Sequence, residues 1–242
     1  MCCKSLRLLR ERAKRLVGLY YEIVEPLFSF PRHRESLAQL LGPQTCYEEC
    51  MTLEMFREAV EGKDVCVLGP LPSAPRNCQL LGAPEGGLER ALEAGLPLAF
   101  LTTDLDAEER LLRMALDIVP FLFVHLHGDN RERFLFFESS LKRNRVIYTS
   151  QSHSLGCVIS LGGFSDGDRA ALFPMIAGAR SVRVFGYDFS KPERGRKPEV
   201  SMKDKALKLS VAREVLMRSA ELLGYDVEEG EVITFSRRGA NT

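Results

Sequence analysis

The sequence predicts an α/β fold with a doubly wound, mostly parallel sheet of the Rossmann-like type and a helical N-terminal appendage. Short apolar runs alternate with helical patterns along most of the chain, which is the arrangement of βαβ units. The run at 121–124 is continuously apolar, as expected for a strand buried on both faces of a parallel sheet. Polar residues follow most of these runs directly, at the strand ends where open α/β sheets bind ligands.

Residues 1–60 are predicted to form the helical appendage. Apolar residues recur at helical spacing over 4–24, with Arg and Lys between them. Shorter helical patterns follow at 34–41 and 53–61, and Gly62 ends the second. The basic first helix could lie on a membrane surface. We favour packing on its own domain, because its apolar stripe is modest.

Residues 61–242 are predicted to form the α/β catalytic domain. Strands are expected at 64–69, 98–102, 121–124, 146–149, 157–161, 181–185 and 231–235. Helices are expected at 87–94, 107–118, 131–140, from the end of the 162–168 loop to about 177, and at 203–223. The proline-rich segment 70–75 suits neither a helix nor a strand, and 191–198 is expected to be disordered.

The composition excludes several classes of protein. Lys+Arg and Asp+Glu both number 33, and this balance argues against a non-specific nucleic-acid binder. The longest apolar segment, 118–126, contains Pro120 and is shorter than the roughly 20 residues of a membrane helix. We therefore expect a cytoplasmic protein with neither a nucleic-acid nor a membrane partner. A homo-oligomer is compatible with the sequence.

The seven cysteines predict reduced thiols rather than a disulfide framework. Their number is odd and no Cys-x-x-Cys pair occurs. Cys46 and Cys50 are one helical turn apart but lack a second pair of zinc ligands. Reduced thiols are the usual state in the cytoplasm.

Carboxylates follow the predicted strands and would meet at one edge of the sheet. They are Asp104, Asp106, Asp129, Asp166, Asp168 and Asp188. So many like charges in one cleft require a cation, and oxygen ligands favour Mg²⁺ shared with a substrate phosphate. Alternatively, Asp104 or Asp106, Asp129 or Asn130, and Asp166 or Asp168 cap the helices that follow them. Both roles can coexist, and we expect at least two carboxylates on the metal.

Other polar residues suggest phosphate contacts. The loop from Gly69 to Ser73 could pass its backbone over phosphates, although it is not a P-loop. Cations at the start of the last helix could reach the same phosphates, although such lysines are usually solvated; they are Lys203, Lys205 and Lys208. His125 and His127 lie at a strand end beside Gly128. Zinc is the lesser interpretation there, because no third nitrogen or sulfur ligand is evident.

These motifs together resemble one family, the archaeal 6-hydroxymethyl-7,8-dihydropterin pyrophosphokinases. The matching segments are Thr-Thr-Asp-Leu-Asp at 102–106, His-Leu-His-Gly-Asp-Asn at 125–130, Gly-Gly-Phe-Ser-Asp-Gly-Asp-Arg at 162–169, Gly-Tyr-Asp-Phe at 186–189 and the lysine helix from 203. They occur in order over 64 to about 210. Departures are Ala107 for Gly, Leu126 for Ala, and a 69–73 loop that is one residue off the family form. Ala-Pro-Glu-Gly stands at 83–86 in place of Ala-Asp-Gly-Ala, which leaves open whether Glu85 replaces that aspartate.

The resemblance implies a Mg²⁺-dependent transfer of diphosphate from ATP to the hydroxymethyl group of the dihydropterin, with release of AMP, for methanopterin- or folate-type synthesis. For this reaction we predict a set of roles. The metal ligands are Asp104, Asp106, Asp129 and Asp168, and the catalytic residues are His127, Asp129 and Asp166. The ATP and phosphate contacts are Gly69, Pro70, Ser73, Thr103, Asn130, Arg169, Lys203 and Lys205. The pterin contacts are Asp188 and His125. His127 would align the substrate hydroxyl or accept its proton.

Three rival functions remain open at this stage. Thiamine pyrophosphokinases share the Asp-x-Asp pair after a strand, and accept thiamine in place of the pterin. A sugar-nucleotide transferase would bind a sugar nucleotide and ignore the pterin. A sensing module would bind Mg²⁺-ATP and form no AMP with any acceptor.

Overall fold

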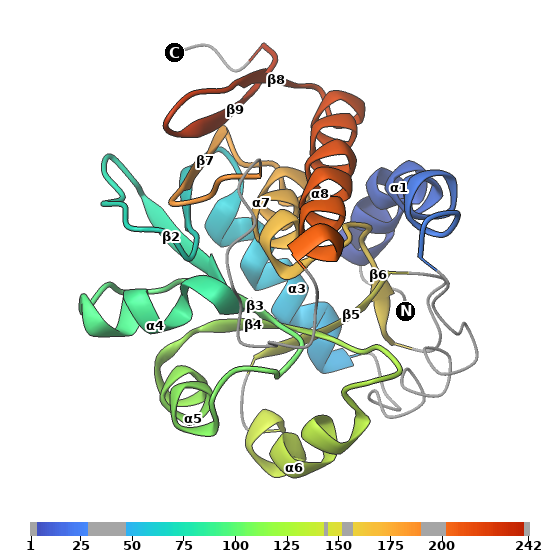
Figure 1. Ribbon diagram of the computed structural model, residues 1–242. Coiled ribbons are helices and arrows are strands. Elements are labelled where there is room, and N and C mark those ends of the chain that lie inside the picture. The colour runs from blue at the N-terminus through green and yellow to red at the C-terminus, as the bar shows by residue number, and fades with distance from the viewer. Residues whose placement is uncertain (1–3, 29–46, 143–144, 152–156, 190–201, 240–242) are drawn as a thin grey trace.

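The computed structural model describes residues 4–28, 47–142, 145–151, 157–189 and 202–239, and within them nine strands form one sheet (Figure 1). The strands are β1 (Asp64–Leu68), β2 (Leu80–Pro84), β3 (Phe100–Thr103), β4 (Phe121–His125), β5 (Val146–Ser150), β6 (Ile159–Ser160), β7 (Ser181–Phe185), β8 (Tyr225–Glu228) and β9 (Ile233–Arg237). Their order is β6-β5-β4-β3-β2-β1-β7-β9-β8. The first seven in this order are parallel, and β9 and β8 add an antiparallel hairpin at one edge.

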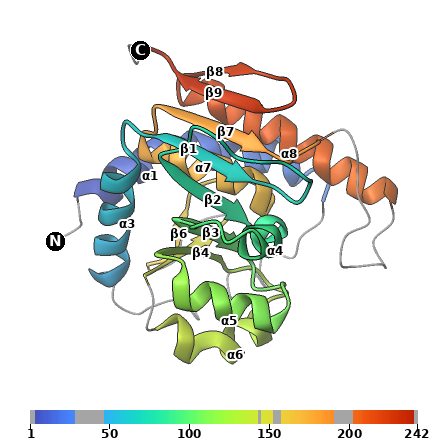
Figure 2. The ribbon, with the colours of Figure 1, turned by 90° about the vertical axis from the view of Figure 1, so that its left-hand side faces the viewer.

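Helices cover both faces of this sheet, so the doubly wound α/β fold is confirmed (Figure 2). One face carries α1 (Lys4–Leu19) with its π-helical continuation η1 (Tyr20–Val24), α3 (Tyr47–Val60), α7 (Asp166–Ala177) and α8 (Met202–Leu222). The other face carries α4 (Glu85–Glu93), α5 (Glu109–Ile118) and α6 (Arg131–Leu141). The strands serve both cores because successive side chains point to opposite faces. In β1, Val65 and Val67 enter the first core, and Cys66 and Leu68 enter the second.

The N-terminal helices share the first of these cores with the sheet. The ring of Phe56 in α3 contacts Phe100, Phe121 and Phe123 of the sheet edge-to-face, at centroid distances of 5.5, 5.5 and 4.7 Å. Such aromatic pairs add to the free energy gained by burial. Residues 4–24 are helical as expected, although the last five form a π-helix. The domain boundary at residue 60 stays a prediction.

Two strands and a disulfide differ from the sequence-based expectations. β2 lies in a segment with no predicted strand, and its register is set by pairing with β1 and β3. β8 was not predicted either, because three of its four residues are exposed and only its pairing with β9 defines it. The prediction of reduced thiols is wrong for Cys66 and Cys78, which form a disulfide, and Cys157 is also disulfide-bonded. The β1–β2 connection places Cys78 beside its partner, which spacing alone does not reveal. The segments 34–41 and 191–198 lie outside the described residues.

No helix in the described ranges combines the length and the apolar character that a membrane span requires.

Candidate active site

Three carboxylates from distant parts of the chain converge at the carboxyl ends of the parallel strands. Glu85 follows β2, Asp104 follows β3 and Asp166 begins α7. One carboxylate oxygen from each lies within 4.8 Å of the other two. The parallel order of β2 and β3 brings the first two together, and α7 crosses the same region of the sheet and supplies the third. Asp104 and Asp166 were expected at one edge of the sheet, and the structure brings them together.

Glu85 is the most deeply buried member, with 6% of its surface exposed. The Thr103 hydroxyl and the Asp106 backbone N–H both donate to its Oε2, the latter over 3.3 Å. The Thr103 hydroxyl in turn accepts the N–H of Leu105 over 2.8 Å. This turn places Leu105 in the left-handed region, with φ of 67°, which is uncommon for a residue other than glycine. The turn after β3 is therefore built around the Glu85 carboxylate.

Burial and the crowding of acids raise the pKa values of Glu85 and Asp166. Burial, then the charges of Asp104 and Asp166, raise the pKa of Glu85 from 4.5 to about 9. Burial and the Asp104 charge raise the pKa of Asp166 from 3.8 to about 7, although Arg169 opposes that rise. A cation bound among the three would favour the ionised forms. Clustered carboxylate oxygens are the donors that a hard divalent cation such as Mg²⁺ takes in proteins, so the residues present fit such an ion.

Arg169 holds Asp166 in place from the protein interior. Its Nη1 donates to Asp166 Oδ1 over 3.3 Å, and its Nη2 lies 3.0 Å from His125 Nε2 and donates to Gln151 Oε1 and Phe164 O over 3.1 Å each. Since a guanidinium can only donate, His125 accepts at Nε2 and presents Nδ1–H to the Thr149 hydroxyl 3.2 Å away. Burial and the Arg169 charge hold the pKa of His125 well below its usual value, so the ring is neutral. His125 and Arg169 are buried, and both were expected to contact substrate.

The N-terminal helical region reaches this buried group of residues. Gln151 donates from Nε2 to the Tyr20 hydroxyl over 3.4 Å, and Tyr20 belongs to η1. A Cβ added at Gly162, which precedes α7, would lie 2.9 Å from the Cβ of Leu16 in α1. The first helix thus packs directly against the loop that leads to Asp166.

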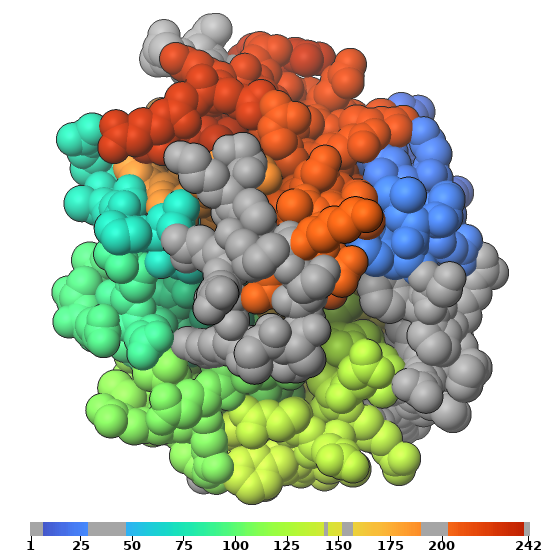
Figure 3. All heavy atoms as spheres, in the orientation of Figure 1, coloured from blue at the N-terminus to red at the C-terminus, as the bar shows by residue number. Residues whose placement is uncertain are grey.

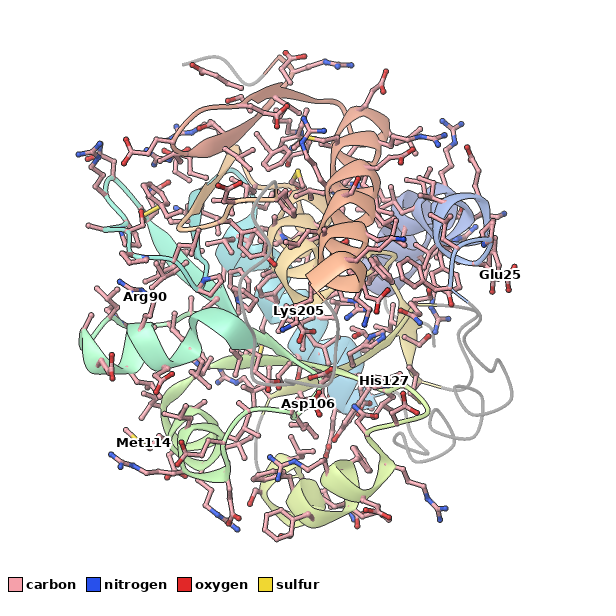
Figure 4. The ribbon with its side chains drawn as sticks, in the orientation of Figure 1. Glu25, Arg90, Asp106, Met114, His127 and Lys205 are labelled. Atoms are coloured by element: carbon pink, nitrogen blue, oxygen red, sulfur yellow. A yellow bond between two sulfur atoms is a disulfide. The ribbon has the colours of Figure 1, made fainter. Side chains whose placement is uncertain are left out.

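His127 lies beside the acid cluster in a defined tautomer. Its Nε2 is 3.4 Å from Asp104 Oδ2, and its Nδ1 accepts the backbone N–H of Asp129 over 3.3 Å. The neutral ring therefore carries its proton on Nε2 and donates it toward Asp104. The amide of Asn130 completes this loop: Nδ2 donates to Asp104 O and His125 O over 2.9 and 2.6 Å, and Oδ1 accepts the N–H of His127 over 3.1 Å. Asp106 and His127 lie near one another in the view of Figure 4, with Lys205 of α8 above them.

Asp168 lies apart from the cluster, because it caps the helix that begins at Asp166. Ser165 is the N-cap of α7, and Asp168 and Ser165 form a reciprocal capping box. The carboxylate of Asp168 accepts the backbone N–H groups of Phe164, Ser165 and Arg169 over 2.6 to 3.0 Å. The expected helix caps are borne out in part. Asn130 is the N-cap of α6 but makes no side-chain cap, and Glu108 holds the N-cap position of α5 in place of Asp104 or Asp106, also without one. In α7 the N-cap is Ser165, and Asp168 is its partner in the capping box.

A pocket of about 710 Å³ lies next to the acid cluster. Four segments line it: the loop after β1, the loop after β7, the first half of α8 and the β8–β9 hairpin. The pocket residues are Leu71, Pro72, Ser73, Gly186, Tyr187, Asp188, Phe189, Ala206, Ser210, Arg213, Glu229, Gly230, Glu231 and Ile233. Tyr187 connects pocket and cluster, because a Cβ added at Gly167, next to Asp166, would lie 1.6 Å from the Tyr187 hydroxyl. Figure 3 shows α8 forming much of the surface on this side.

The remaining predicted contacts vary in accessibility. Gly69 is buried, its N–H donates to Phe185 O over 2.7 Å, and a Cβ there would lie 2.4 Å from Gly186 O. Pro70 is exposed, and Ser73 lines the pocket. Lys203 is exposed and Lys205 is half-buried on the first turn of α8. Asp106 and Asp129 are exposed beside the cluster.

No family model matches this chain. A protein of Pyrococcus furiosus named 6-hydroxymethyl-7,8-dihydropterin pyrophosphokinase is 37% identical over 144 residues, which are 55% of this chain and 59% of the relative. Proteins of the same name from Methanocaldococcus jannaschii and Methanothermobacter thermautotrophicus are 23% and 31% identical, over 78% and 45% of their lengths and 71% and 44% of this chain. The match thus spans about three fifths of the Pyrococcus protein. These similarities confirm the resemblance that the motifs predict.

Proposed function

We propose that this chain, a relative of the archaeal 6-hydroxymethyl-7,8-dihydropterin pyrophosphokinases, transfers the β,γ-diphosphate of ATP to the hydroxymethyl group of that dihydropterin and releases AMP. The observation that carries this proposal is the cluster of Glu85, Asp104 and Asp166 beside a pocket large enough for a bicyclic ring. Transfer of a phosphoryl-type group depends mainly on positioning and on neutralising charge, and both needs are met by residues of this kind.

The three clustered carboxylates are proposed to hold Mg²⁺. When bound, the ion supplies neutralisation of the charge on the diphosphate oxygens. Glu85 is proposed as a metal ligand in place of Asp168, which the sequence predicted for this role but whose oxygens accept backbone N–H groups at the start of α7. Asp106 and Asp129, exposed at the rim, add negative charge that attracts the cation toward the cluster.

The histidines and Arg169 are proposed to position the carboxylates rather than to exchange protons. His127 donates from Nε2 toward Asp104, and its Nδ1 lone pair is engaged by the Asp129 N–H. These contacts support a role of His127 in orienting Asp104, whereas the two roles expected for it toward the substrate hydroxyl stay predictions. Arg169 fixes the rotamer of Asp166, while the neutral ring of His125 accepts from the guanidinium without adding charge.

The pterin is proposed to occupy the pocket lined by Tyr187 and Phe189. Their rings lie 4.8 Å apart and offer an aromatic surface for a flat heterocycle. Asp188 lines the same pocket, and a carboxylate can accept both the 2-amino and the N3 hydrogens of a pterin. Lys203 and Lys205, on the first turn of the helix that forms one wall, are proposed to attract the phosphates of ATP.

The test measures AMP released from ATP in the presence of Mg²⁺ and a panel of acceptors: the hydroxymethyl-dihydropterin, thiamine, a sugar nucleotide and none. We expect AMP release with the dihydropterin and with none of the other acceptors. The Asp104→Asn variant should lose activity by about a hundredfold or more, while Asp117→Asn, an exposed aspartate of α5, keeps it. AMP with thiamine alone would identify a thiamine pyrophosphokinase, and Mg²⁺-ATP binding without AMP would identify a sensing module. Near-normal turnover of Asp104→Asn would contradict the assignment of Asp104 as a Mg²⁺ ligand.

A further inference from the structure

A second pocket, of about 490 Å³, lies at the opposite end of α7 from Asp166. It is formed by α1, the last turn of α7, the connection from α8 to β8, and β9. Figure 1 shows α1 and α8 next to each other on this part of the molecule. Since α7 has twelve residues that each rise about 1.5 Å, its two ends are about 18 Å apart. The pocket is therefore separate from the acid cluster.

The lining of this second pocket is strongly basic. Four cations and one acid line it; the cations are Arg12, Lys14, Arg15 and Arg237, and the acid is Glu11. A Cβ placed on Gly178 would lie 3.5 Å from Arg12 Nη1, 3.6 Å from Arg237 Nη1 and 3.6 Å from Glu61 Cγ, so two guanidinium groups and the side chain of Glu61 converge over this glycine. Glu61 is ion-paired with Arg57, which does not line the pocket. Among the described residues, no ion pair neutralises any of the four cations.

Stabilisation of the fold accounts for part of this charge. Arg12 donates from Nη1 to Ile176 O over 2.8 Å, at the C-terminal end of α7. The C-termini of α7 and α8 both reach the pocket, and each carries about half a negative charge. Together with Glu11 they offset about two of the four positive charges, which leaves a surplus of about two. Two guanidinium groups near the same point repel each other, and an anion between them would relieve this repulsion.

We propose that this pocket binds a doubly charged phosphate-type anion. The surplus of positive charge matches a dianion, and paired guanidinium groups can hold phosphate oxygens through charge-assisted hydrogen bonds. The left-handed backbone of Gly178, with φ of 96°, leaves the floor of the pocket without a side chain. The anion is either free inorganic phosphate or the phosphate of a nucleotide.

The experiment titrates the full-length, metal-free protein in EDTA at low salt with inorganic phosphate, sulfate or AMP, and measures binding by calorimetry. We expect saturable binding that Arg237→Gln weakens by about tenfold, and Lys14→Gln/Arg15→Gln by a similar factor. The matched control is Arg238→Gln: Arg238 is adjacent, carries the same charge and pairs instead with Asp226. It should bind like the unmodified protein, and so should Asp104→Asn.

The outcomes separate the proposal from its alternatives. Tighter binding of AMP than of phosphate identifies a nucleotide as the ligand, and equal binding identifies the free anion; both support the site. Equal affinity of Arg237→Gln and Arg238→Gln would overturn it, as would the absence of saturable binding at millimolar anion. A changed affinity in Asp104→Asn would locate the anion beside the acid cluster instead and overturn the site, because removing this carboxylate charge alters only anion binding near it. Thermal unfolding without anion checks that both arginine variants are folded.

Discussion

Replacing Glu85 by Gln is expected to stabilise the metal-free protein at alkaline pH. The pKa of Glu85 is raised from 4.5 to about 9, so between these values the folded state holds a proton that the unfolded chain releases. The free energy of unfolding must then fall as pH rises. The raised pKa of Asp166 acts in the same direction, but only up to about pH 7. The interval above pH 7 therefore isolates Glu85.

The magnitude follows from the proton count. One additional proton on the folded state lowers the free energy of unfolding by about 1.4 kcal/mol per pH unit. Between about pH 7 and pH 8.5 the unmodified protein should lose about 2 kcal/mol, and Glu85→Gln should lose little. Gln keeps a carbonyl oxygen that can accept from the Thr103 hydroxyl and the Asp106 N–H, so the turn after β3 should persist.

The assay is urea unfolding at several pH values in EDTA and again with saturating Mg²⁺. The matched control is Glu93→Gln, an exposed glutamate of the same helix that carries the same charge change. Mg²⁺ should restore the stability of the unmodified protein at alkaline pH and have a smaller effect on Glu85→Gln. This reasoning would be refuted if the free energy of unfolding of the unmodified protein in EDTA did not change with pH above pH 7. It would also be refuted if that free energy fell equally steeply with pH in the unmodified protein, Glu85→Gln and Glu93→Gln.

Three further predictions concern residues around the cluster. His127→Ala should raise the Mg²⁺ concentration needed for AMP formation by about tenfold, and His127→Gln by less, because its amide can still donate; an unchanged Mg²⁺ requirement contradicts the role in orienting Asp104. Arg169→Lys should lower the free energy of unfolding in urea by about 3 kcal/mol, because one ammonium cannot reach all of the guanidinium's acceptors; a loss below about 1 kcal/mol is inconsistent with this. Gly167→Ala should cost about 1 to 3 kcal/mol through its clash with Tyr187, and combining it with Tyr187→Ala should cost less than the sum of the two changes; additive costs would show that the added methyl group does not contact the Tyr187 ring.

The parallel strands were predictable where burial alone defines them. The runs that became β1, β4 and β7 are apolar over most of their length, and their positions follow from that pattern. β2 contains Gly82 and ends in Pro84, two residues that are unfavourable in an isolated strand. It forms because neighbouring strands pair with it on both sides, and Gly82 leaves room for the ring of Phe100. Such information lies in the tertiary contacts rather than in the local sequence.

Because strand β2 was not predicted, Glu85 was not among the expected metal ligands. An acid after a strand was the signal used for Asp104 and Asp166, and Glu85 satisfies it once β2 is recognised. Asp168, in contrast, was expected as a metal ligand but lies outside the cluster. Residues two apart on a helix point about 200° away from each other, so Asp166 and Asp168 of α7 cannot both face the cluster. Placing the start of α7 at Asp166 rather than after the 162–168 loop would have separated them.

The charges at the two ends of α7 show how fold-stabilising charge can be told from charge that requires a ligand. A helix favours acids at its N-terminus and bases at its C-terminus, and α7 has Asp166 and Asp168 at one end and Arg12 at the other. Asp168 and Arg12 are satisfied by backbone groups of the helix, so stability accounts for them. When the three clustered carboxylates are all ionised, their negative charge exceeds the positive charge of Arg169, which pairs with Asp166. A divalent cation has the charge that balances this excess, and the helix dipole alone does not.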